Sequence, residues 1–369
     1  KYFEEMKRLN PEIIKIVTKA NSVTDNFVIF DLIKKSVEEK RRIAAFCMGP
    51  YGEFSRVLSV ILGSEITYAS ISKGKESASG QITLDEMLNV YRVKKLNKDT
   101  KIYGLIGNPV EHSLSPRIFN SLFDTPNDNA VYIKFMVDRL EEFLDYFRSM
   151  NIGGFSVTMP HKIGIMGYLK NEVNEKARHI GAVNTVVVNN GELIGYNTDC
   201  DGAIEALSGK TDLRGKRVVV IGAGGASRAV VCGLAESKSI VTILNRTREK
   251  AKDIAADFGC GYGQLSDLGS IDYDILINVT SVGMGRPEES PVPANLIKEG
   301  AIVFDMVYKP LMTRLLREAE SKGCTIIDGL EMLINGDLRQ FKLWTGRDAD
   351  GRSVKEMVLS HLENAGHQN

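Results

Sequence analysis

Residues 217–230 read RVVVIGAGGASRAV, and this stretch decides the fold of the second half of the chain. Residues 218–221 are apolar and β-branched, which is typical of a buried strand. A glycine-rich turn follows, formed by Gly222, Ala223, Gly224, Gly225 and Ala226. Such a turn lets backbone N–H groups approach a pyrophosphate at the N-terminus of a helix. The pattern predicts a dinucleotide-binding α/β unit of the Rossmann type, although Ser227 occupies the third glycine position of the fingerprint.

The end of the next predicted strand indicates which dinucleotide is bound. IVTILNRT (240–247) ends where NAD-dependent enzymes carry an acidic residue for the ribose 2′-hydroxyl. This chain has Asn245, Arg246, Thr247 and Arg248 instead, so a 2′-phosphate would meet two guanidiniums and a hydroxyl. The alternative is a solvated turn with ordinary surface arginines. We expect NADP as the cofactor.

Composition limits the class of protein. A chain of 369 residues exceeds one ordinary core, so we expect two or three domains. Lys plus Arg equals Asp plus Glu at 47 each, which argues against a nucleic-acid-binding protein. No apolar run reaches the ~20 residues of a membrane span, and no signal peptide opens the chain. The five cysteines form no CxxC pair, so we expect reduced thiols, no metal site and a cytoplasmic location, or a plastid in a plant.

Strands alternate with helices along the whole chain, which predicts parallel sheets. In residues 1–95 we expect helices at 1–9, 27–40, 53–63 and 83–93, and strands at 12–20, 41–49 and 65–70. A polar linker at 94–100 precedes a second α/β domain, residues 100–207, which the C-terminal helices of 330–369 join. An Asn190-Gly191 pair predicts a hairpin turn there. The dinucleotide-binding domain covers residues 208–329.

Three stretches before the glycine-rich turn carry candidate site residues. NPVEHSLSP (108–116) places Ser113 and Ser115 ahead of a helix start, where hydroxyls and N–H groups suit a carboxylate; simple helix capping is the alternative. FSVTMPHK (155–162) ends a strand and presents Lys162, and GYNTDCDG (195–202) supplies Asp199. A lysine needs a charged neighbour or a dry pocket to become a useful acid, so a pair with Asp199 could pass a proton while a hydride moves to NADP. Ordinary surface charges are the alternative, and we expect His161 to be structural.

From about residue 100 to the end, the chain resembles the shikimate dehydrogenase family. The matching motifs are GNPVEHSLSP, GGFSVTMPHK, GAVNT, GYNTDCDG, IGAGGASRA, NRT, NVTSVGM, DMVYKP and WTG. The resemblance implies reversible NADP-linked oxidation of shikimate to 3-dehydroshikimate. It also implies two domains, an α/β substrate domain and an NADP-binding Rossmann domain.

The same resemblance implies roles for individual residues. Ser113 and Ser115 would hold the substrate carboxylate and favour shikimate over quinate, and Lys162 and Asp199 would form the catalytic pair. The other implied contacts are to substrate from Thr158, Asn184 and Tyr308, and to NADP from Thr280, Met306 and Gly329.

One position departs from the family pattern. The final helix of the family carries a glutamine in ML-x-x-Q that contacts substrate, whereas EMLINGDLRQF (331–341) has Gly336 there. Gln340 lies one helical turn later, on the same face. We expect weaker substrate binding than in relatives, or an inactive variant.

Residues 1–95 resemble the C-terminal portion of the type I 3-dehydroquinate dehydratase family, which forms a (β/α) barrel. The matches are Lys15 in IIKIV (13–17), as the Schiff-base lysine, Met48 and Arg56 in FCMGPYGEFSR (46–56), and Ser77 and Gln81 in SASGQIT (77–83). The catalytic histidine of that family lies upstream of the lysine, and all five histidines of this chain lie at residue 112 or beyond. We expect a partial barrel from a bifunctional enzyme, which a missing N-terminal part would complete, and no dehydratase turnover from this chain alone.

Two other functions stay open from the sequence. A quinate/shikimate dehydrogenase that accepts NAD would keep most of these motifs, although the NRTR turn and the two serines speak against it. A non-catalytic regulator that binds NADP or shikimate is compatible with Gly336 and an incomplete barrel. The presence of both Lys162 and Asp199 speaks against that alternative.

Overall fold

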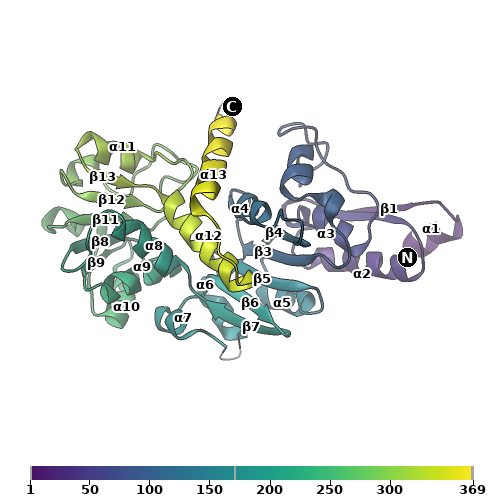
Figure 1. The fold of residues 1–369 in the computed structure, drawn as a ribbon, viewed down its shortest axis with the longest axis horizontal. Coiled ribbons are helices and arrows are strands. Elements are labelled where there is room, and N and C mark those ends of the chain that lie inside the picture. The colour runs from purple at the N-terminus through teal and green to yellow at the C-terminus, as the bar shows by residue number, and fades with distance from the viewer. Residues whose placement is uncertain (1, 170–171, 367–369) are drawn as a thin grey trace. The chain divides into compact units, whose positions relative to one another are not determined.

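The computed structural model describes residues 2–169 and 172–366, which fall into two compact units (Figure 1). Unit 1 combines residues 1–170 with 185–194, and unit 2 combines 171–184 with 195–369. This division differs from the sequence-based boundaries because the C-terminal helices belong to the same unit as the dinucleotide-binding sheet. The functional boundaries proposed from the sequence stay a prediction.

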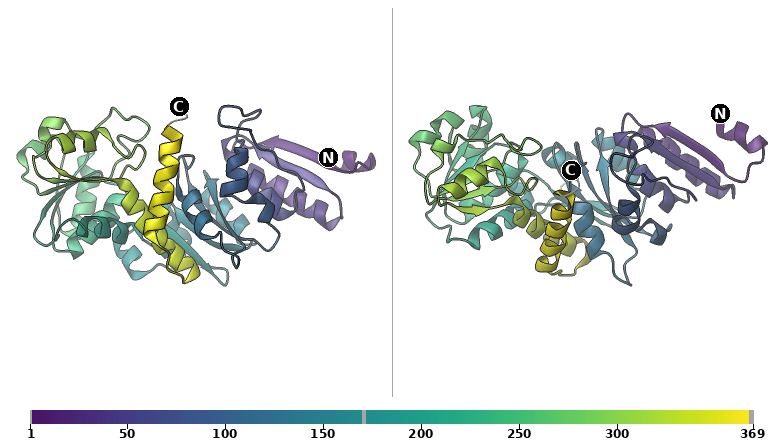
Figure 2. Two further views of the ribbon diagram at one scale, coloured as in Figure 1. Left: turned by 45° about the horizontal axis from the view of Figure 1, so that its top comes forward. Right: turned by 90° about the horizontal axis from the view of Figure 1, so that it is seen from above.

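Residues 2–95, here called the N-terminal segment, open unit 1 with two parallel strands. The elements are α1 (Tyr2–Arg8), β1 (Ile14–Lys19), α2 (Asp25–Glu38), β2 (Ile43–Met48) and α3 (Ser55–Leu62). Figure 2 shows α2 running along the pair of strands. The core of the segment consists of Phe3, Ile14, Ala20, Ile29, Ile33, Ile43, Ala45 and Cys47. The segment thus forms two consecutive strand–helix units, β1–α2 and β2–α3, of the expected partial barrel.

The strand predicted at 65–70 is wrong, so the N-terminal sheet has two strands rather than three. The backbone N–H of Glu65 donates to the carbonyl of Ile43 over 2.9 Å, but the chain then leaves the edge of β2. Only Ser70 forms an isolated bridge, to Thr83. Between Glu65 and Ser70, Ser64 Oγ donates to the carbonyl of Ile66 and the Arg56 guanidinium donates to the carbonyl of Tyr68. These side chains take the place of a neighbouring strand as hydrogen-bond partners.

The helix predicted at 83–93 is shorter and irregular. Hydrogen bonding of the π type covers Glu86–Val90 (η2), with the N–H of Tyr91 donating to the carbonyl of Glu86 over 2.8 Å. Arg92 then adopts a left-handed conformation with φ 50°, which ends the helix. A short 3₁₀ turn, Val93–Lys95 (η3), leads into the next sheet.

The second sheet of unit 1 has the strand order β4-β3-β5-β6-β7. Its elements are β3 (Lys101–Gly107), α4 (Ser115–Leu122), β4 (Ala130–Met136), α5 (Leu140–Phe147), β5 (Ile152–Val157), α6 (His161–Gly164), η4 (Ile165–Tyr168), β6 (Thr185–Asn189) and β7 (Glu192–Tyr196). β3 runs parallel to β4 and β5, and β6 runs antiparallel to β5. Asn190 and Gly191 have φ angles of 49° and 81°, as the predicted hairpin turn requires.

Aromatic side chains join the N-terminal segment to this sheet. Phe54 packs edge-on against Phe135 of β4, with ring centroids 5.0 Å apart. Phe27 stacks on Tyr146 of α5 at 4.1 Å, and the Tyr146 hydroxyl donates to Asp31 over 2.6 Å. The N-terminal segment and the second sheet therefore share one core.

Unit 2 contains six parallel strands in the order β10-β9-β8-β11-β12-β13. This is the order 3-2-1-4-5-6 of a doubly wound dinucleotide-binding sheet, which confirms the fold predicted from the glycine-rich turn. The elements are α7 (Glu175–Ile180), α8 (Asp199–Ser208), β8 (Arg217–Ile221), α9 (Gly225–Glu236), β9 (Ile240–Leu244), α10 (Arg248–Phe258), β10 (Gly261–Gly263), η5 (Leu265–Ser270), β11 (Ile275–Asn278), η6 (Ala294–Leu296), β12 (Ile302–Asp305), α11 (Arg314–Ser321), β13 (Thr325–Ile327), α12 (Gly329–Thr345) and α13 (Gly351–Gly366).

Helices α8 and α12 cross at close range because a glycine lies at their contact. A Cβ atom on Gly202 would lie 3.0 Å from the carbonyl oxygen of Met332 and 3.2 Å from the backbone nitrogen of Gly336. Any side chain at Gly202 would push the two backbones apart. This contact packs α12 against the first turns of α8, the helix that Asp199 begins.

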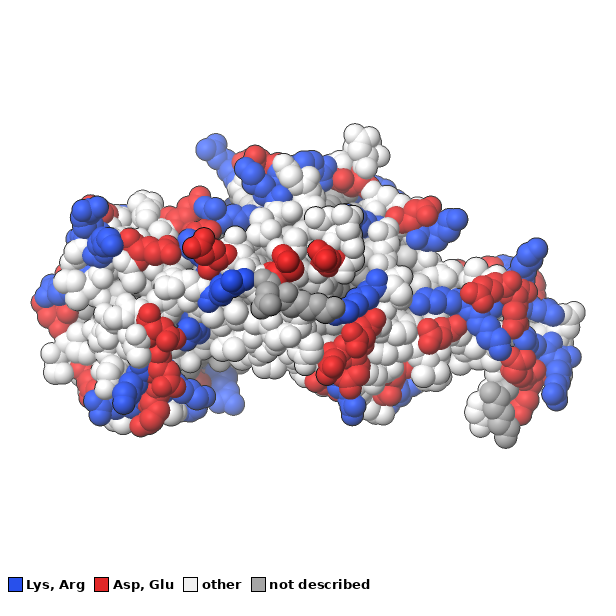
Figure 3. Space-filling model, turned by 90° about the horizontal axis from the view of Figure 1, so that it is seen from below, with Lys and Arg blue, Asp and Glu red and all other residues white. Residues whose placement is uncertain are grey.

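The surface carries both signs of charge. Lys and Arg are interspersed with Asp and Glu on the face drawn in Figure 3. Elsewhere in the described residues, opposite charges also pair, as Arg217 does with Asp274. Among the helices of the described residues, none is long and apolar enough to cross a membrane.

Candidate functional site

The loop that follows β3, residues 108–115, is here called the serine loop. The backbone N–H of Ser115 donates to Ser113 Oγ over 3.2 Å, so the two predicted serines lie together. Ser115 is buried at the first turn of α4, while Ser113 is half-buried. Helix N-termini favour negative charge, and the arrangement suits a carboxylate as the sequence predicts.

Thr158 and Lys162 lie at the neighbouring strand end. The N–H of Thr158 donates to the carbonyl of Ile106 over 2.9 Å, which holds it beside the end of β3. A Cβ atom on Gly107 would lie 2.3 Å from Thr158 Cγ2, so only glycine allows this approach. Lys162 follows on the short helix α6 and is half-buried. Thr158, Lys162 and the serine loop thus follow adjacent parallel strands of unit 1.

His161 has a structural contact, as the sequence analysis expects. Its Nε2 lies 2.8 Å from the carbonyl oxygen of Val137, just after β4. This bond ties the start of α6 to the end of β4. The contact leaves Lys162, the next residue, as the candidate for proton transfer.

In unit 2, Asn184 organises the start of α8. Its Nδ2 donates to Asp199 Oδ1 over 2.8 Å and to Thr198 Oγ1 over 3.0 Å, while its Oδ1 accepts from the N–H of Thr198 over 2.8 Å. Asn197 Oδ1 accepts from the N–H of Asp199 over 3.1 Å. The predicted residues Asn184 and Asp199 therefore touch, and Thr198 and Asn197 are supporting residues that the sequence analysis did not single out, although both lie in the GYNTDCDG motif.

Gly336 and Gln340 both face this cluster. A Cβ atom on Gly336 would lie 3.8 Å from Thr198 Oγ1, an ordinary contact distance. Gln340 is buried, and its Nε2 lies 3.5 Å from the same Thr198 oxygen. This chain lacks the family's amide at Gly336, but Gln340 places an amide one turn later, next to Thr198, which Asn184 also contacts.

The glycine-rich turn has the geometry of a phosphate cradle. Gly222 has φ 118°, and a Cβ atom there would lie 2.9 Å from Thr280 Cγ2. α9 begins at Gly225, so its free N–H groups face the turn. Ser227 is buried and its Oγ donates to the carbonyl of Gly222 over 2.8 Å, so serine at the third fingerprint position stabilises the turn. A pyrophosphate fits this cradle.

The NRTR turn follows β9 and opens α10. Asn245 Nδ2 donates to the carbonyl of Thr247 over 2.9 Å, which shapes the turn. Arg246, Thr247 and Arg248 are all exposed. The Arg248 guanidinium lies 5.3 Å from the ring centre of Tyr262, and neither arginine forms an ion pair with a described residue. Both guanidiniums are therefore available for a 2′-phosphate.

Buried polar residues hold the ends of β11 and β12. Asp305 is fully buried and accepts hydrogen bonds from Thr313 Oγ1 at 2.6 Å and Asn278 Nδ2 at 2.8 Å. Burial raises the pKa of Asp305, and these hydrogen bonds oppose the increase. Asn278 Oδ1 also accepts from Thr280 Oγ1 at 2.7 Å. This network positions Thr280 at the switch point of the sheet, where dinucleotides bind.

The remaining predicted cofactor and substrate residues of unit 2 lie after β12. A Cβ atom on Gly329 would lie 2.3 Å from the carbonyl oxygen of Met306, so α12 begins in backbone contact with that segment. Tyr308 is half-buried. Burial, together with the nearby Asp337, raises the pKa of Tyr308 to about 12. Its phenol stays a hydrogen-bond donor at neutral pH, as a carboxylate partner requires.

Two of the predicted dehydratase residues, Lys15 and Arg56, lie over aromatic rings of the N-terminal segment. Lys15 Nζ lies 4.1 Å from the ring centre of Tyr68, and the guanidinium of Arg56 lies 4.5 Å from that of Phe46. Arg56 is buried, and its Nη2 has no hydrogen-bond partner among the described residues.

Ser77 and Gln81 form a second group. The backbone N–H of Ser77 donates to Gln81 Oε1 over 2.7 Å. The turn between these two residues contacts the end of β2, where the N–H of Gly49 donates to the carbonyl of Ser79 over 2.9 Å. Met48 ends β2 directly before Gly49.

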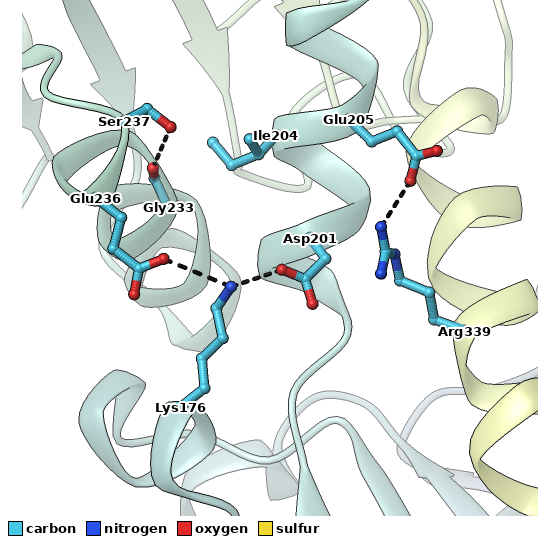
Figure 4. A pocket seen from close by; sticks show the side chains of 8 residues that line it. All are labelled: Lys176, Asp201, Ile204, Glu205, Gly233, Glu236, Ser237 and Arg339. Atoms are coloured by element: carbon cyan, nitrogen blue, oxygen red, sulfur yellow. Dashed lines mark hydrogen bonds and ion pairs between the residues drawn. The ribbon is translucent and has the colours of Figure 1, made fainter. Parts of the chain in front are cut away.

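Among the described residues, one group of potential metal ligands lies between α8 and α9. No metal-binding motif in the sequence indicates this group. Cys200, Cys232 and Glu236 place one ligand atom each within 4.8 Å of one another. Figure 4 shows the neighbouring Lys176, whose Nζ lies 2.6 Å from Asp201 and 3.5 Å from Glu236. The ammonium group therefore already supplies a positive charge to these carboxylates.

Comparison with protein families gives three matches along the chain. Residues 1–98 match type I 3-dehydroquinase, residues 105–186 match the shikimate dehydrogenase substrate-binding domain, and residues 205–301 match shikimate/quinate 5-dehydrogenase. These matches confirm both resemblances noted in the sequence.

Individual relatives agree with the family matches. Shikimate dehydrogenase (NADP(+)) of Pyrococcus abyssi is 47% identical over 264 residues, covering 71% of this chain and 98% of the relative. The chloroplastic bifunctional 3-dehydroquinate dehydratase/shikimate dehydrogenase of Arabidopsis thaliana is 38% identical over 364 residues, and this chain spans 60% of its length. Shikimate 5-dehydrogenase of Thermus thermophilus, solved with NADP(H) and shikimate, has a TM-score of 0.64 at 37% identity, covering 70% of this chain and 98% of the other.

The NRTR turn generates a prediction on cofactor choice. The double substitution Arg246→Ala with Arg248→Ala removes both guanidiniums, so the Kd for NADPH should rise about tenfold or more, because hydrogen bonds to charged groups contribute ~1.5–3 kcal/mol. The Kd for NADH should change less than about twofold, since NADH lacks the 2′-phosphate. Fluorescence titration measures both constants. Lys252→Ala, an exposed cation one turn further along α10, is the matched control, and an equal loss there would contradict the assignment.

Proposed function

Because the chain belongs to the shikimate dehydrogenase family, we propose that it catalyses the reversible NADP-linked reduction of 3-dehydroshikimate to shikimate. The observation that carries the proposal is the cluster at the start of α8, where Asn184 holds the Asp199 carboxylate at 2.8 Å. A carboxylate fixed in this way, with a half-buried Lys162 in the same chain, provides the two groups that proton transfer needs.

NADPH, when bound, supplies the hydride that reduces the carbonyl carbon. In the proposed mechanism Lys162 and Asp199 deliver the proton that the carbonyl oxygen takes up. Asn184 keeps the carboxylate of Asp199 oriented by donating to Oδ1. In the oxidative direction the same pair accepts the hydroxyl proton.

The proposed substrate contacts follow from the chemistry of the side chains. Ser113, Ser115 and the protonated phenol of Tyr308 would donate hydrogen bonds to the substrate carboxylate. Thr158 and Asn184 would bind ring hydroxyls. Two serine hydroxyls together with a tyrosine match a carboxylate better than a neutral group.

The proposed cofactor contacts use the cradle after β8 and the NRTR turn. The N-terminus of α9 would bind the pyrophosphate, and Arg246 and Arg248 the 2′-phosphate. The rest of the NADP site would be lined by Thr280, Met306 and Gly329. The proposed ligands are thus small molecules, and we expect a cytoplasmic location, or a plastid in a plant, as for the chloroplastic Arabidopsis relative.

Initial rates test the function directly. Formation of the reduced cofactor should be fast with shikimate and NADP, and slower by at least about tenfold when quinate replaces shikimate or NAD replaces NADP, because hydrogen bonds to charged groups contribute ~1.5–3 kcal/mol. Comparable rates with quinate and NAD would favour a quinate/shikimate dehydrogenase. A folded protein that binds NADP without turnover would favour the non-catalytic regulator.

Gly336 generates a prediction on substrate binding. The substitution Gly336→Gln should lower the KM for shikimate about two- to tenfold, because a hydrogen bond contributes ~0.5–1.5 kcal/mol. The free energy of unfolding should also rise by up to about 1 kcal/mol, since glycine weakens a helix interior. Gly336→Ala supplies the stability gain without the amide, so it is the matched control. An unchanged KM in Gly336→Gln would mean that Gln340 already fills this role.

We also propose that the N-terminal segment is a dehydratase portion that is inactive in this chain. Its Lys15, Arg56, Ser77 and Gln81 are present, but a Schiff-base mechanism needs an acid–base group near the lysine. Residues 1–95 contain no histidine. The dehydratase activity of the longer Arabidopsis relative is therefore not expected here.

Borohydride trapping checks this expectation. Incubation with 3-dehydroquinate and borohydride should give no turnover and little or no adduct, and Lys15→Ala should behave like the unsubstituted chain. An adduct on Lys15 together with measurable dehydration would contradict the proposal.

A further inference from the structure

The N-terminal segment contacts the start of the serine loop and the helix that follows the loop. At the start of the loop, Asn108 Nδ2 donates a hydrogen bond to the Tyr51 hydroxyl over 3.1 Å. Just beyond the loop, Arg117 in the first turn of α4 lies 3.9 Å from the carboxylate of Glu86. Tyr51 and Glu86 both belong to the dehydratase-like segment, whereas the loop belongs to the dehydrogenase part of unit 1.

A third contact reaches the middle of the loop through a lysine. Lys134 of β4 lies 3.2 Å from Glu53 Oε1 and donates to the carbonyl of Glu111 over 3.3 Å. Its side chain is only 14% exposed. Removing the negative partner of such a cation is costly, so the Glu53 carboxylate helps to hold the lysine at the loop carbonyl.

The serine loop has little regular structure of its own. Its backbone bonds include Ser113 N to the carbonyl of Val110 and Asn108 N to the carbonyl of Met159. Fixing the backbone of one residue costs about 1–2 kcal/mol of conformational entropy. Contacts from outside the loop therefore determine how well its two serines are held.

We propose that the N-terminal segment positions the serine loop for the substrate carboxylate through Tyr51 and the Glu53–Lys134 pair. The inference rests on the proposed function of Ser113 and Ser115. Tyr51, Glu53 and Lys134 are positioning residues, since each acts through the loop. The dehydratase-like segment thereby serves the dehydrogenase site even when it has no turnover of its own.

The same chain offers a matched control for Tyr51. Tyr146 is also half-buried and also joins the N-terminal segment to the second sheet. Its shortest hydrogen bond is to Asp31 over 2.6 Å, and longer ones connect it to Phe27 and Lys34. It lies on α5, and its hydroxyl and ring contact residues of α2 and α5 rather than the serine loop. Replacing either tyrosine by phenylalanine removes one hydroxyl and leaves the ring in place.

The experiment compares Tyr51→Phe and Tyr146→Phe in the full chain. Tyr51→Phe should raise the KM for shikimate about two- to tenfold, with kcat and the KM for NADP within about twofold, because one hydrogen bond to the loop is lost. Hydrogen–deuterium exchange of residues 108–115 should accelerate in Tyr51→Phe and stay unchanged in Tyr146→Phe. Thermal unfolding of both variants measures the change in global stability, so that a general destabilisation can be told apart from an effect on the loop.

Glu53→Gln is the second variant, and it should accelerate exchange in the same loop. Unchanged exchange in Tyr51→Phe, faster exchange without a change in KM, or an equal KM change in Tyr146→Phe would each overturn the inference. No turnover of shikimate by the unsubstituted chain would instead contradict the proposed function. Loop exchange is measured without substrate, so it separates the two failures.

Discussion

The buried carboxylate of Asp305 imposes a constraint on the ends of the unit 2 sheet. An ionisable group that is fully buried has to be hydrogen-bonded, and Asp305 meets this requirement with Thr313, Asn278 and the backbone N–H of Val307. These bonds fix the ends of β11 and β12 relative to each other. The segments that carry Thr280 and Tyr308 start from these ends, so their positions depend on the same network.

A comparable network governs the start of α8. Asn184 lies 15 residues before Asp199 in the sequence and is bonded to it and to Thr198. Gln340 reaches Thr198 from α12, which packs closely on α8 because Gly202 leaves room for the backbone of Gly336. Gly336, which stands where the family has a glutamine, lies at this close crossing, and Gln340 supplies another amide to the same cluster.

The two parts of unit 1 are connected by aromatic packing and by a few polar contacts. Phe54 and Phe135 belong to different family matches, yet their rings are 5.0 Å apart. Burial of such rings is a large contribution to stability. The same interface includes Tyr51, which contacts the serine loop directly, and Glu53, which reaches the loop through Lys134. Residues that match one family are therefore part of the structure that surrounds the serine loop, which belongs to the match with another family.

The sequence by itself determined the local features of this protein. The glycine-rich turn, the Asn190-Gly191 hairpin and the alternation of strands and helices depend on backbone preferences within a few residues, so they could be read directly. The grouping of Ser113 with Ser115 follows from their spacing. The family motifs further named Asn184, Asp199 and the cofactor residues.

The tertiary structure decided the features that depend on distant partners. Residues 65–70 have the composition of a strand, but they leave the edge of β2 because side chains take up their carbonyls. Tyr51 and Asn108 are 57 residues apart, and no local pattern links them. Cys200 and Cys232 meet only because α8 packs on α9. Local preference selects the type of element, whereas packing between elements selects which side chains touch.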